Sequence, residues 1–199
     1  MFWASVGVLL TGASDLSAVL AKLREPKTLR AHFVQTKESP AFSSPRVVEG
    51  QVIFARPRRL RWMTERPFST SLVLDGDRVT MRMSELDRER RIDLAAHPEM
   101  KAVFDTLLFF AEADVRGLEG RFLVRLKEGE GGSAVGRKLV LTPVSDGLKK
   151  LISEIRVELA ASGRHLEKVE LLQHDGAKTS WHFVDVKLDG PVEASVFDE

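Results

Sequence analysis

The sequence predicts a mainly β protein of the α+β class: an open antiparallel β-barrel, or curved sheet, with an α-helical lid over its concave apolar face. Over most of the chain, short segments alternate apolar and polar residues, as strands with one buried face do. In residues 98–111 the apolar residues change to helical spacing, and a shorter amphipathic helix precedes the first strand. A sheet that is wet on one face needs cover on the other, so both helices are expected on the concave side.

Residues 1–14 are predicted to be the remnant of a signal peptide, and residues 15–199 to form a single domain. Residues 2–10 are apolar and are followed by small residues at 11–14, of the kind that a signal peptidase accepts. The apolar stretch is too short to span a bilayer. Because it lacks a basic beginning, a buried start of the first helix is the alternative interpretation.

The first predicted helix covers residues 16–23, with Asp15 as its N-cap. Its apolar residues share one face of the helix: Leu16, Val19, Leu20 and Leu23. Pro26 ends the helix, because proline lacks the N–H that the next helical turn would need.

Residues 50–76 are predicted to form an antiparallel meander, and the period-two pattern continues to Asp93. Its first strand ends at Arg56-Pro57, the second carries Trp62, and the third closes in the turn Asp75-Gly76. The opposite faces hold mostly Arg, Thr, Ser and Gln and are expected to be solvated, and the mixed charges of residues 84–93 indicate a solvated hairpin. Period-two alternation places these side chains on the apolar face: Val52, Phe54, Arg56, Leu60, Trp62, Leu72, Leu74, Val79, Met81 and Met83.

His97-Pro98 is expected to open the second helix, and strands resume after it. The glycine-rich residues 129–134 imitate a dinucleotide-binding loop, but a strand follows them where such a loop would open a helix, which favours a hairpin. The helix has its apolar residues at Met100, Val103, Phe104, Leu107, Leu108 and Ala111, and the later strands are expected at 122–126, 138–142, 153–159, 166–172 and 179–188.

The composition limits the classes of function open to this chain. With 199 residues, 43% of them hydrophobic, it can bury a core, and its net charge of +1 gives no overall field for nucleic acid or an anionic membrane. The absence of cysteine removes disulfides and thiol chemistry. The five histidines show no spacing of metal ligands, and no nucleophile motif is present. We therefore expect no cofactor, no metal and no enzymatic activity.

Five arginines cluster early in the meander, at Arg56, Arg58, Arg59, Arg61 and Arg66. Trp62 and Phe68 lie near them, as stacking residues do in nucleic-acid-binding proteins. On a strand, however, Arg59 and Arg61 point away from Trp62, so the basic and aromatic groups do not share a face. A solvated outer face is the favoured interpretation, docking of an acidic protein or lipid headgroup is the alternative, and no nucleic acid is expected.

Arg56 differs from the other four arginines, because it has the parity of Val52 and Phe54 and should point to the apolar side. A charge there needs hydrogen-bond acceptors. Arg56 is expected either to find such acceptors on the apolar side or to extend to water from the rim.

The order and spacing of these segments resemble the periplasmic lipoprotein-carrier family of the LolA type, with its receptor relative LolB. In that family one strand ends in Arg-Pro, the next presents a Trp and the third ends in Asp-Gly, as residues 50–76 do here. Further likenesses are the opening strand Ala31–Gln35, the entry Glu49-Gly50-Gln51, the strand 139–143 and a late aromatic strand at Phe197. The resemblance covers nearly the whole chain after residue 14.

The resemblance implies a soluble periplasmic carrier that holds the acyl chains of a lipoprotein or other lipid and ferries it to the outer membrane. It implies an inner-membrane releasing transporter and an outer-membrane acceptor protein as partners, a monomeric state, and a role for Arg56 in holding the lid closed when the carrier is empty. Residues expected to contact the cargo are Phe33, Val52, Phe54, Arg56, Leu60, Trp62, Leu74, Met81, Met83, Phe104, Leu107 and Leu108.

Two departures from the family pattern make another lipid, such as one made by a polyketide or glycolipid pathway, an alternative to a classical lipoprotein as cargo. The chain has no Tyr, and Met81-Arg82-Met83 stands where family members commonly carry one. It also ends two residues after Phe197, short of the family's usual C-terminal extension. The alternatives from other classes are a protein-docking β-domain without cargo and, third, a hydrolase that uses the same cavity.

Overall fold

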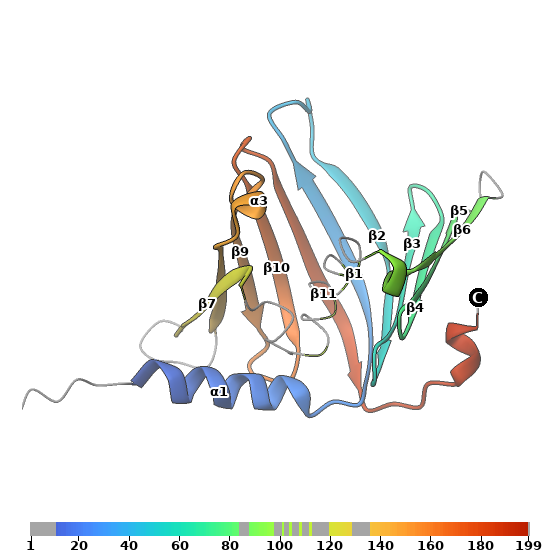
Figure 1. Cartoon of the computed structure of the whole chain (residues 1–199), viewed down its shortest axis with the longest axis horizontal. Helices are drawn as coiled ribbons and strands as arrows, with labels where there is room; N and C mark the ends of the chain where they lie inside the picture. The colour runs from blue at the N-terminus through green and yellow to red at the C-terminus, as the bar shows by residue number, and fades with distance from the viewer. Residues whose placement is uncertain are drawn as a thin grey trace, which may run out of the picture.

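The computed structural model describes residues 11–83, 88–97, 120–128 and 136–198, together with Lys101, Phe104, Leu108 and Glu112. Its main element is one curved antiparallel sheet of eleven strands in the order β6-β5-β4-β3-β2-β1-β11-β10-β9-β8-β7 (Figure 1). The edge strands β6 and β7 do not pair with each other, so the sheet is open. The predicted fold class is confirmed.

The described strands agree with the predicted ones except at Phe197, and the structure adds short helices. The helices are α1 (Thr11–Arg24), η2 (Leu94–Ala96), α3 (Asp146–Lys149) and η5 (Ala194–Phe197). The strands are β1 (Thr28–Glu38), β2 (Arg46–Ala55), β3 (Arg59–Arg66), β4 (Thr70–Asp75), β5 (Arg78–Met83), β6 (Arg88–Asp93), β7 (Phe122–Lys127), β8 (Lys138–Pro143), β9 (Ile152–Leu159), β10 (Leu166–Gln173) and β11 (Lys178–Leu188).

The first and last strands of the chain, β1 and β11, are neighbours in the middle of the sheet. From β1 it proceeds by hairpins to the edge strand β6, and the segment 94–121 then leads to the opposite edge strand β7. Strands β8 to β11 return to the middle, where β11 pairs with β1 over Leu29–Glu38. Two described residues of this connection, Phe104 and Leu108, are buried against one face of the sheet.

The concave face of the sheet is apolar across strands because directly paired residues share a face. Ala31, Val52, Trp62, Leu72 and Met81 are paired in succession from β1 to β5. On the other half, the same face carries the pairs of Val157 with Val169 and of Val169 with Trp181. This face holds two core clusters, one in each half of the sheet.

Helix α1 covers the half of the concave face formed by β7–β10, and crosses beneath these strands in Figure 1. Val19, Leu20 and Leu23 are buried there, as their spacing predicts. The predicted start of this helix is wrong: α1 includes Thr11, so Asp15 lies inside the helix and is not its N-cap. The helix ends at Arg24, ahead of Pro26, as expected.

The other half of the concave face is covered by the predicted second helix, as far as it is described. The N–H of Lys101 donates to the carbonyl of His97 at 2.9 Å, a helical hydrogen bond. Phe104 and Leu108 are buried and pack in the cluster that contains Val52, Leu60 and Leu74. Met100, Val103, Leu107 and Ala111 lie outside the described residues.

The convex face of β2–β4 is not solvated throughout, contrary to the prediction. Ile53, Ala55 and Val73 point to this side and are buried beneath Phe197 of η5. The late aromatic residue Phe197 therefore lies in a 3-10 helix rather than in the expected strand. The C-terminal segment reaches the convex side of the sheet, whereas both other covers lie on the concave side.

Gly50 marks a close approach of β2 to its neighbours. A Cβ on Gly50 would lie 1.9 Å from the carbonyl oxygen of Met63 and 2.8 Å from Cζ of Phe33. Phe33 pairs directly with Gly50, and its ring lies 4.3 Å from that of Trp62, centroid to centroid. The missing side chain thus makes room for the aromatic pair that joins β1 to β3.

We predict that Gly50→Ala lowers the free energy of unfolding by about 3 kcal/mol, because the methyl group would overlap a backbone atom that has no free space to move into. Urea unfolding followed by circular dichroism measures the change. The matched control is Gly147→Ala in α3, where an added Cβ meets no atom within 4 Å. An equal loss in both variants would show that the close approach at Gly50 is unimportant.

Candidate ligand cavity

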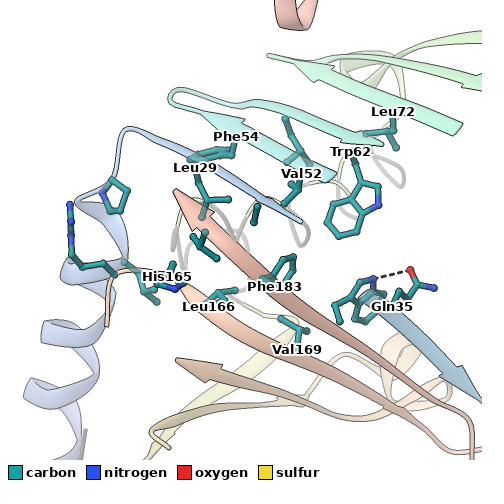
Figure 2. A pocket seen from close by; sticks show the side chains of 17 residues that line it. Leu29, Gln35, Val52, Phe54, Trp62, Leu72, His165, Leu166, Val169 and Phe183 are labelled. Atoms are coloured by element: carbon teal, nitrogen blue, oxygen red, sulfur yellow. Dashed lines mark hydrogen bonds between the residues drawn. The ribbon is translucent and has the colours of Figure 1, made fainter. Parts of the chain in front are cut away.

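A cavity of about 350 Å³ lies on the concave face, between the two core clusters. Figure 2 shows Leu29, Val52, Phe54 and Trp62 on one side of it and Leu166, Val169 and Phe183 on the other, with His165 beside the end of α1. Its lining residues are Leu23, Pro26, Leu29, Ala31, Gln35, Val52, Phe54, Leu60, Trp62, Leu72, Arg164, His165, Leu166, Val169, Trp181, Phe183 and Val186.

The position of the cavity follows from the seam between β1 and β11. Ala31 lies on this seam and has only a methyl group to offer to the concave face. The register between β1 and β11 shifts between Arg30 and His32, and Asp185 on the partner strand has a positive φ of 53°. Such a bulge bends the sheet locally. The covers pack on either side of the seam, and the space between them remains open.

Aromatic side chains fix the walls of the cavity. Trp62 meets Phe183 edge to face across the seam, with ring centroids 6.4 Å apart. The indole N–H of Trp181 donates to Oε1 of Gln35 at 2.9 Å, so both polar groups are satisfied within the wall. The wall therefore offers rigid apolar surface to a ligand.

The structure brings several of the expected cargo residues together and separates others. Val52, Phe54, Leu60 and Trp62 line the cavity. A second set lies on the same face but is packed against the walls: Phe33, Leu74, Met81, Phe104 and Leu108. Leu107 lies outside the described residues. Whether any of these residues binds cargo stays a prediction.

Met83 does not lie in the cavity, contrary to the prediction. Its side chain is 46% exposed. It has the parity of Met81, but it is the last residue of β5 and pairs with Thr70 and Arg88 at the ends of the neighbouring strands. The alternation along a strand thus predicts which face of the sheet a side chain lies on, but not whether a helix covers it there.

Only four of the 17 lining residues were in the predicted set, and the missed ones include those from β10 and β11 such as Val169, Trp181 and Phe183. The strands themselves are predicted, and the alternation of Trp181 and Phe183 with polar neighbours is a usable signal. Their position beside β1 depends on the long-range pairing of β11 with β1, which local alternation does not reveal.

Arg56 follows the last residue of β2 and extends its guanidinium toward the two covers. Its Nε donates to the carbonyl of Pro26 at 2.9 Å, and its Nη2 donates to the carbonyls of Leu23 at 3.5 Å and Glu112 at 3.2 Å. Desolvation by burial lowers the pKa of Arg56, and attraction by Glu112 opposes that shift. Arginine nevertheless remains charged, so these are charge-assisted hydrogen bonds.

A second arginine, Arg164, also contacts the segment at the end of α1. Its Nε donates to Oε2 of Glu25 at 3.1 Å, and its Nη2 donates to Oδ2 of Asp189 at 2.8 Å. The N–H of Lys27 also donates to Asp189, at 2.7 Å. These hydrogen bonds, that of Lys27 first, hold the pKa of Asp189 below its usual value. The turn after α1 is thus fixed to β11 and to the loop before β10.

The remaining arginines of the predicted basic cluster have partners within the molecule. Arg58 pairs with Asp77 at 3.3 Å, and Arg66 pairs with Glu49. Arg59 lies over the ring of Phe197 at 5.1 Å from its centroid, and Arg61 donates to the carbonyl of Val196 at 2.8 Å. Arg59 and Arg61 do face the convex side, as predicted, but they contact the C-terminal segment there.

The arrangement is suited to holding an apolar molecule without covalent chemistry. Within the described ranges, no three His, Asp or Glu side chains gather where they could hold a metal ion. No helix among the same residues is both long and apolar enough to cross a membrane. Three of the lining residues are polar, and two of them, Gln35 and Arg164, already have partners.

Comparison with known proteins gives consistent matches. The family described as "Outer membrane lipoprotein carrier protein LolA" matches residues 24–198. An outer-membrane lipoprotein carrier protein of Dechloromonas aromatica is 26% identical over 192 residues, 95% of this chain and 85% of that protein. One of Pseudomonas aeruginosa is 24% identical over 198 residues, 97% of this chain and 88% of that protein. A solved structure of an uncharacterized conserved protein from Thermus thermophilus superposes with a TM-score of 0.58 at 9% identity and covers 93% of each chain.

His165 yields a prediction about pH. Among the described residues its Nδ1 has no hydrogen-bond partner, and burial lowers its pKa from the usual 6.5. The unfolded chain therefore binds this proton more readily, and stability falls as the pH drops below about 6.5. We expect His165→Phe to flatten the decline in unfolding free energy between about pH 7 and pH 5. Exposed His182, changed to Gln, is the control, and equal slopes for wild type and His165→Phe would contradict the assignment.

Proposed function

Because the chain belongs to the LolA family of outer membrane lipoprotein carriers, we propose that it holds the acyl chains of a lipoprotein, or of another lipid, in the cavity and ferries them across the periplasm to the outer membrane. The observation that carries this proposal is the apolar cavity of about 350 Å³ between the two covers of the sheet. No reaction is part of the proposal, since carrying requires only binding and release.

The physical requirement for such a carrier is burial of hydrocarbon. Each methylene group kept from water contributes about 0.8 kcal/mol, so an acyl chain leaves a membrane only if a comparable apolar surface receives it. The cavity lies at the lower end of the roughly 300–1,000 Å³ that is common for ligand sites. The closed form thus accommodates part of an acyl chain, and a larger cargo requires the covers to move.

A carrier must also release its cargo, which favours a lid held by a few breakable contacts. Arg56 supplies such contacts, because one side chain joins the carbonyls of Leu23 and Pro26 at the end of α1 to that of Glu112. Hydrogen bonds to a charged group contribute about 1.5–3 kcal/mol each, so the three bonds of Arg56 together correspond to the burial of roughly 6–11 methylene groups. Entry of an acyl chain therefore offsets the loss of these bonds and shifts the equilibrium toward the open form.

The proposed partners are those of the family's transport route: an inner-membrane transporter that releases the lipoprotein and an outer-membrane protein that accepts it. The proposed state in solution is a monomer. The cavity also favours a carrier over a protein-docking domain without cargo, since a docking domain gains nothing from unfilled apolar space on its concave face.

We predict that wild-type protein binds a hydrophobic fluorophore or a long-chain acyl ligand saturably, with one site per chain. Leu72→Trp should weaken this binding about tenfold, which corresponds to about 1.4 kcal/mol of binding free energy. The larger side chain fills space that the ligand would occupy. Fluorescence titration measures both affinities. Leu151→Trp is the matched control, because Leu151 is 63% exposed and lies outside the cavity wall. Equal affinities for the two variants would exclude the cavity as the binding site.

We predict that Arg56→Leu takes up cargo at least as well as wild type but hands it on more slowly, because the variant loses the bonds that close the empty form. Arg56→Lys should release cargo at a rate between those of wild type and Arg56→Leu, since an ammonium group keeps the charge but lacks the planar guanidinium fork. The measurement is loading from donor vesicles followed by release to acceptor membranes. Arg30→Leu on the exposed face of β1 is the control, and release rates equal to wild type for Arg56→Leu would refute a closing role.

A further inference from the structure

Two arginines on the edge strand β6, Arg88 and Arg90, share the face that contains the cavity. Arg90 pairs directly with Met81, and Arg88 pairs with Met83. Met81 in turn pairs with Leu72, which lines the cavity. Paired residues share a face, so Leu72, Met81 and Arg90 form one row that leads from the cavity to the sheet edge.

Arg88 and Arg90 are exposed, and neither has an ion pair or hydrogen bond with any residue that the structure describes. The convex side of the same two strands is different. There Arg82 and Arg91 both bind Glu89, each at 2.6 Å. The strand pair therefore carries partly neutralised charge on its convex face and positive charge without a described partner on its concave face.

The other cationic groups around the cavity are already engaged. Arg56 donates to three backbone carbonyls, and Arg164 binds Glu25 and Asp189. A negatively charged ligand would have to displace these partners to reach either side chain. Arg88 and Arg90 require no such exchange with any residue in the described part of the chain.

The surface between the cavity and these arginines is apolar. Met81 is half-buried against the core cluster, and Met83 is exposed beside it. Neighbouring strands lie about 4.8 Å apart, so two strand spacings place Arg90 about 10 Å from Leu72 along the row. An amphiphile with its chain against Trp62 and Leu72 can cross this distance over flexible methionine side chains before its headgroup begins.

We propose that Arg88 and Arg90 form a subsite for an anionic headgroup, a phosphate or carboxylate, of the lipid whose acyl chain occupies the cavity. Two guanidinium forks on one strand face match the planar or tetrahedral oxygens of such groups. The proposal rests on the proposed carrier function, because the cavity must first hold the chain. It selects among cargoes: lipids with a net negative headgroup bind better than zwitterionic lipids of the same chain length.

The test compares lysophosphatidylglycerol with lysophosphatidylcholine of equal chain length, below their micelle concentrations, in displacement of a cavity-bound fluorophore. Wild type should prefer the anionic lipid. Arg90→Gln should lower affinity for the anionic lipid about three- to tenfold and leave the zwitterionic lipid unchanged, and the double variant Arg88→Gln/Arg90→Gln should abolish the preference. The preference should also shrink at high salt.

Arg91→Gln is the matched control, because it removes the same charge from the next position of the same strand but on the convex face. Equal losses for Arg90→Gln and Arg91→Gln would reduce the effect to general attraction and overturn the subsite. An unchanged preference in the double variant would overturn it as well. If neither lipid displaces the fluorophore from wild type, the proposed carrier function fails, and the subsite with it.

Two further experiments distinguish the headgroup of a bound lipid from a free anion and from a membrane surface. Inorganic phosphate at the concentration of the lipid should not compete with the anionic lipid, because it lacks the chain; competition would indicate a free-ion site and overturn the proposal. Sedimentation with phosphatidylglycerol vesicles gives the last comparison. If Arg90→Gln weakens vesicle binding without weakening lysolipid binding, the arginines contact a membrane surface and the headgroup subsite is wrong.

Discussion

The structure depends on one constraint: the open sheet of eleven strands has an apolar face, and pairing between strands does not bury that face from water. Two covers bury this face from its two halves, α1 over β7–β10 and the segment containing Phe104 and Leu108 over β2–β5. They leave a gap at the seam of β1 and β11, where the lining is apolar and the volume suits a hydrocarbon chain. The cavity is thus a consequence of covering an unclosed sheet incompletely.

The contacts that hold the covers differ in kind from those that hold the sheet. The sheet is fixed by continuous ladders and by close packing such as that of Phe33 over Gly50. The covers are packed through buried side chains, and two arginines add polar contacts: Arg56 joins the end of α1 to Glu112, and Arg164 joins the turn after α1 to the end of β11. On the convex side, Phe197 and its neighbours form a separate apolar cluster. A rigid sheet whose two covers are joined to each other through Arg56 can change the size of the cavity without changing the fold.

Local patterns predicted the meander because alternation, the Arg-Pro strand end and the Asp75-Gly76 turn are all encoded within a few residues. The inward direction of Arg56 followed from parity in the same way. Features that depend on distant segments were missed: Phe197 covers Ile53 and Val73, and β11 brings Trp181 and Phe183 to the cavity. Met83 shows the remaining limit, since parity gives the face of a strand but not the extent of its cover.

The most direct test of the account is whether an acyl chain enters the space between Trp62 and Trp181. The measurement is quenching of tryptophan fluorescence by a fatty acid brominated in mid-chain, in a Trp3→Phe background with either Trp62 or Trp181 also changed to Phe. The account predicts that the single remaining tryptophan is quenched in each of the two variants. Quenching should reach half of its maximum at the fatty-acid concentration that half-saturates binding. Saturable binding that quenches neither tryptophan would place the ligand elsewhere and contradict the account.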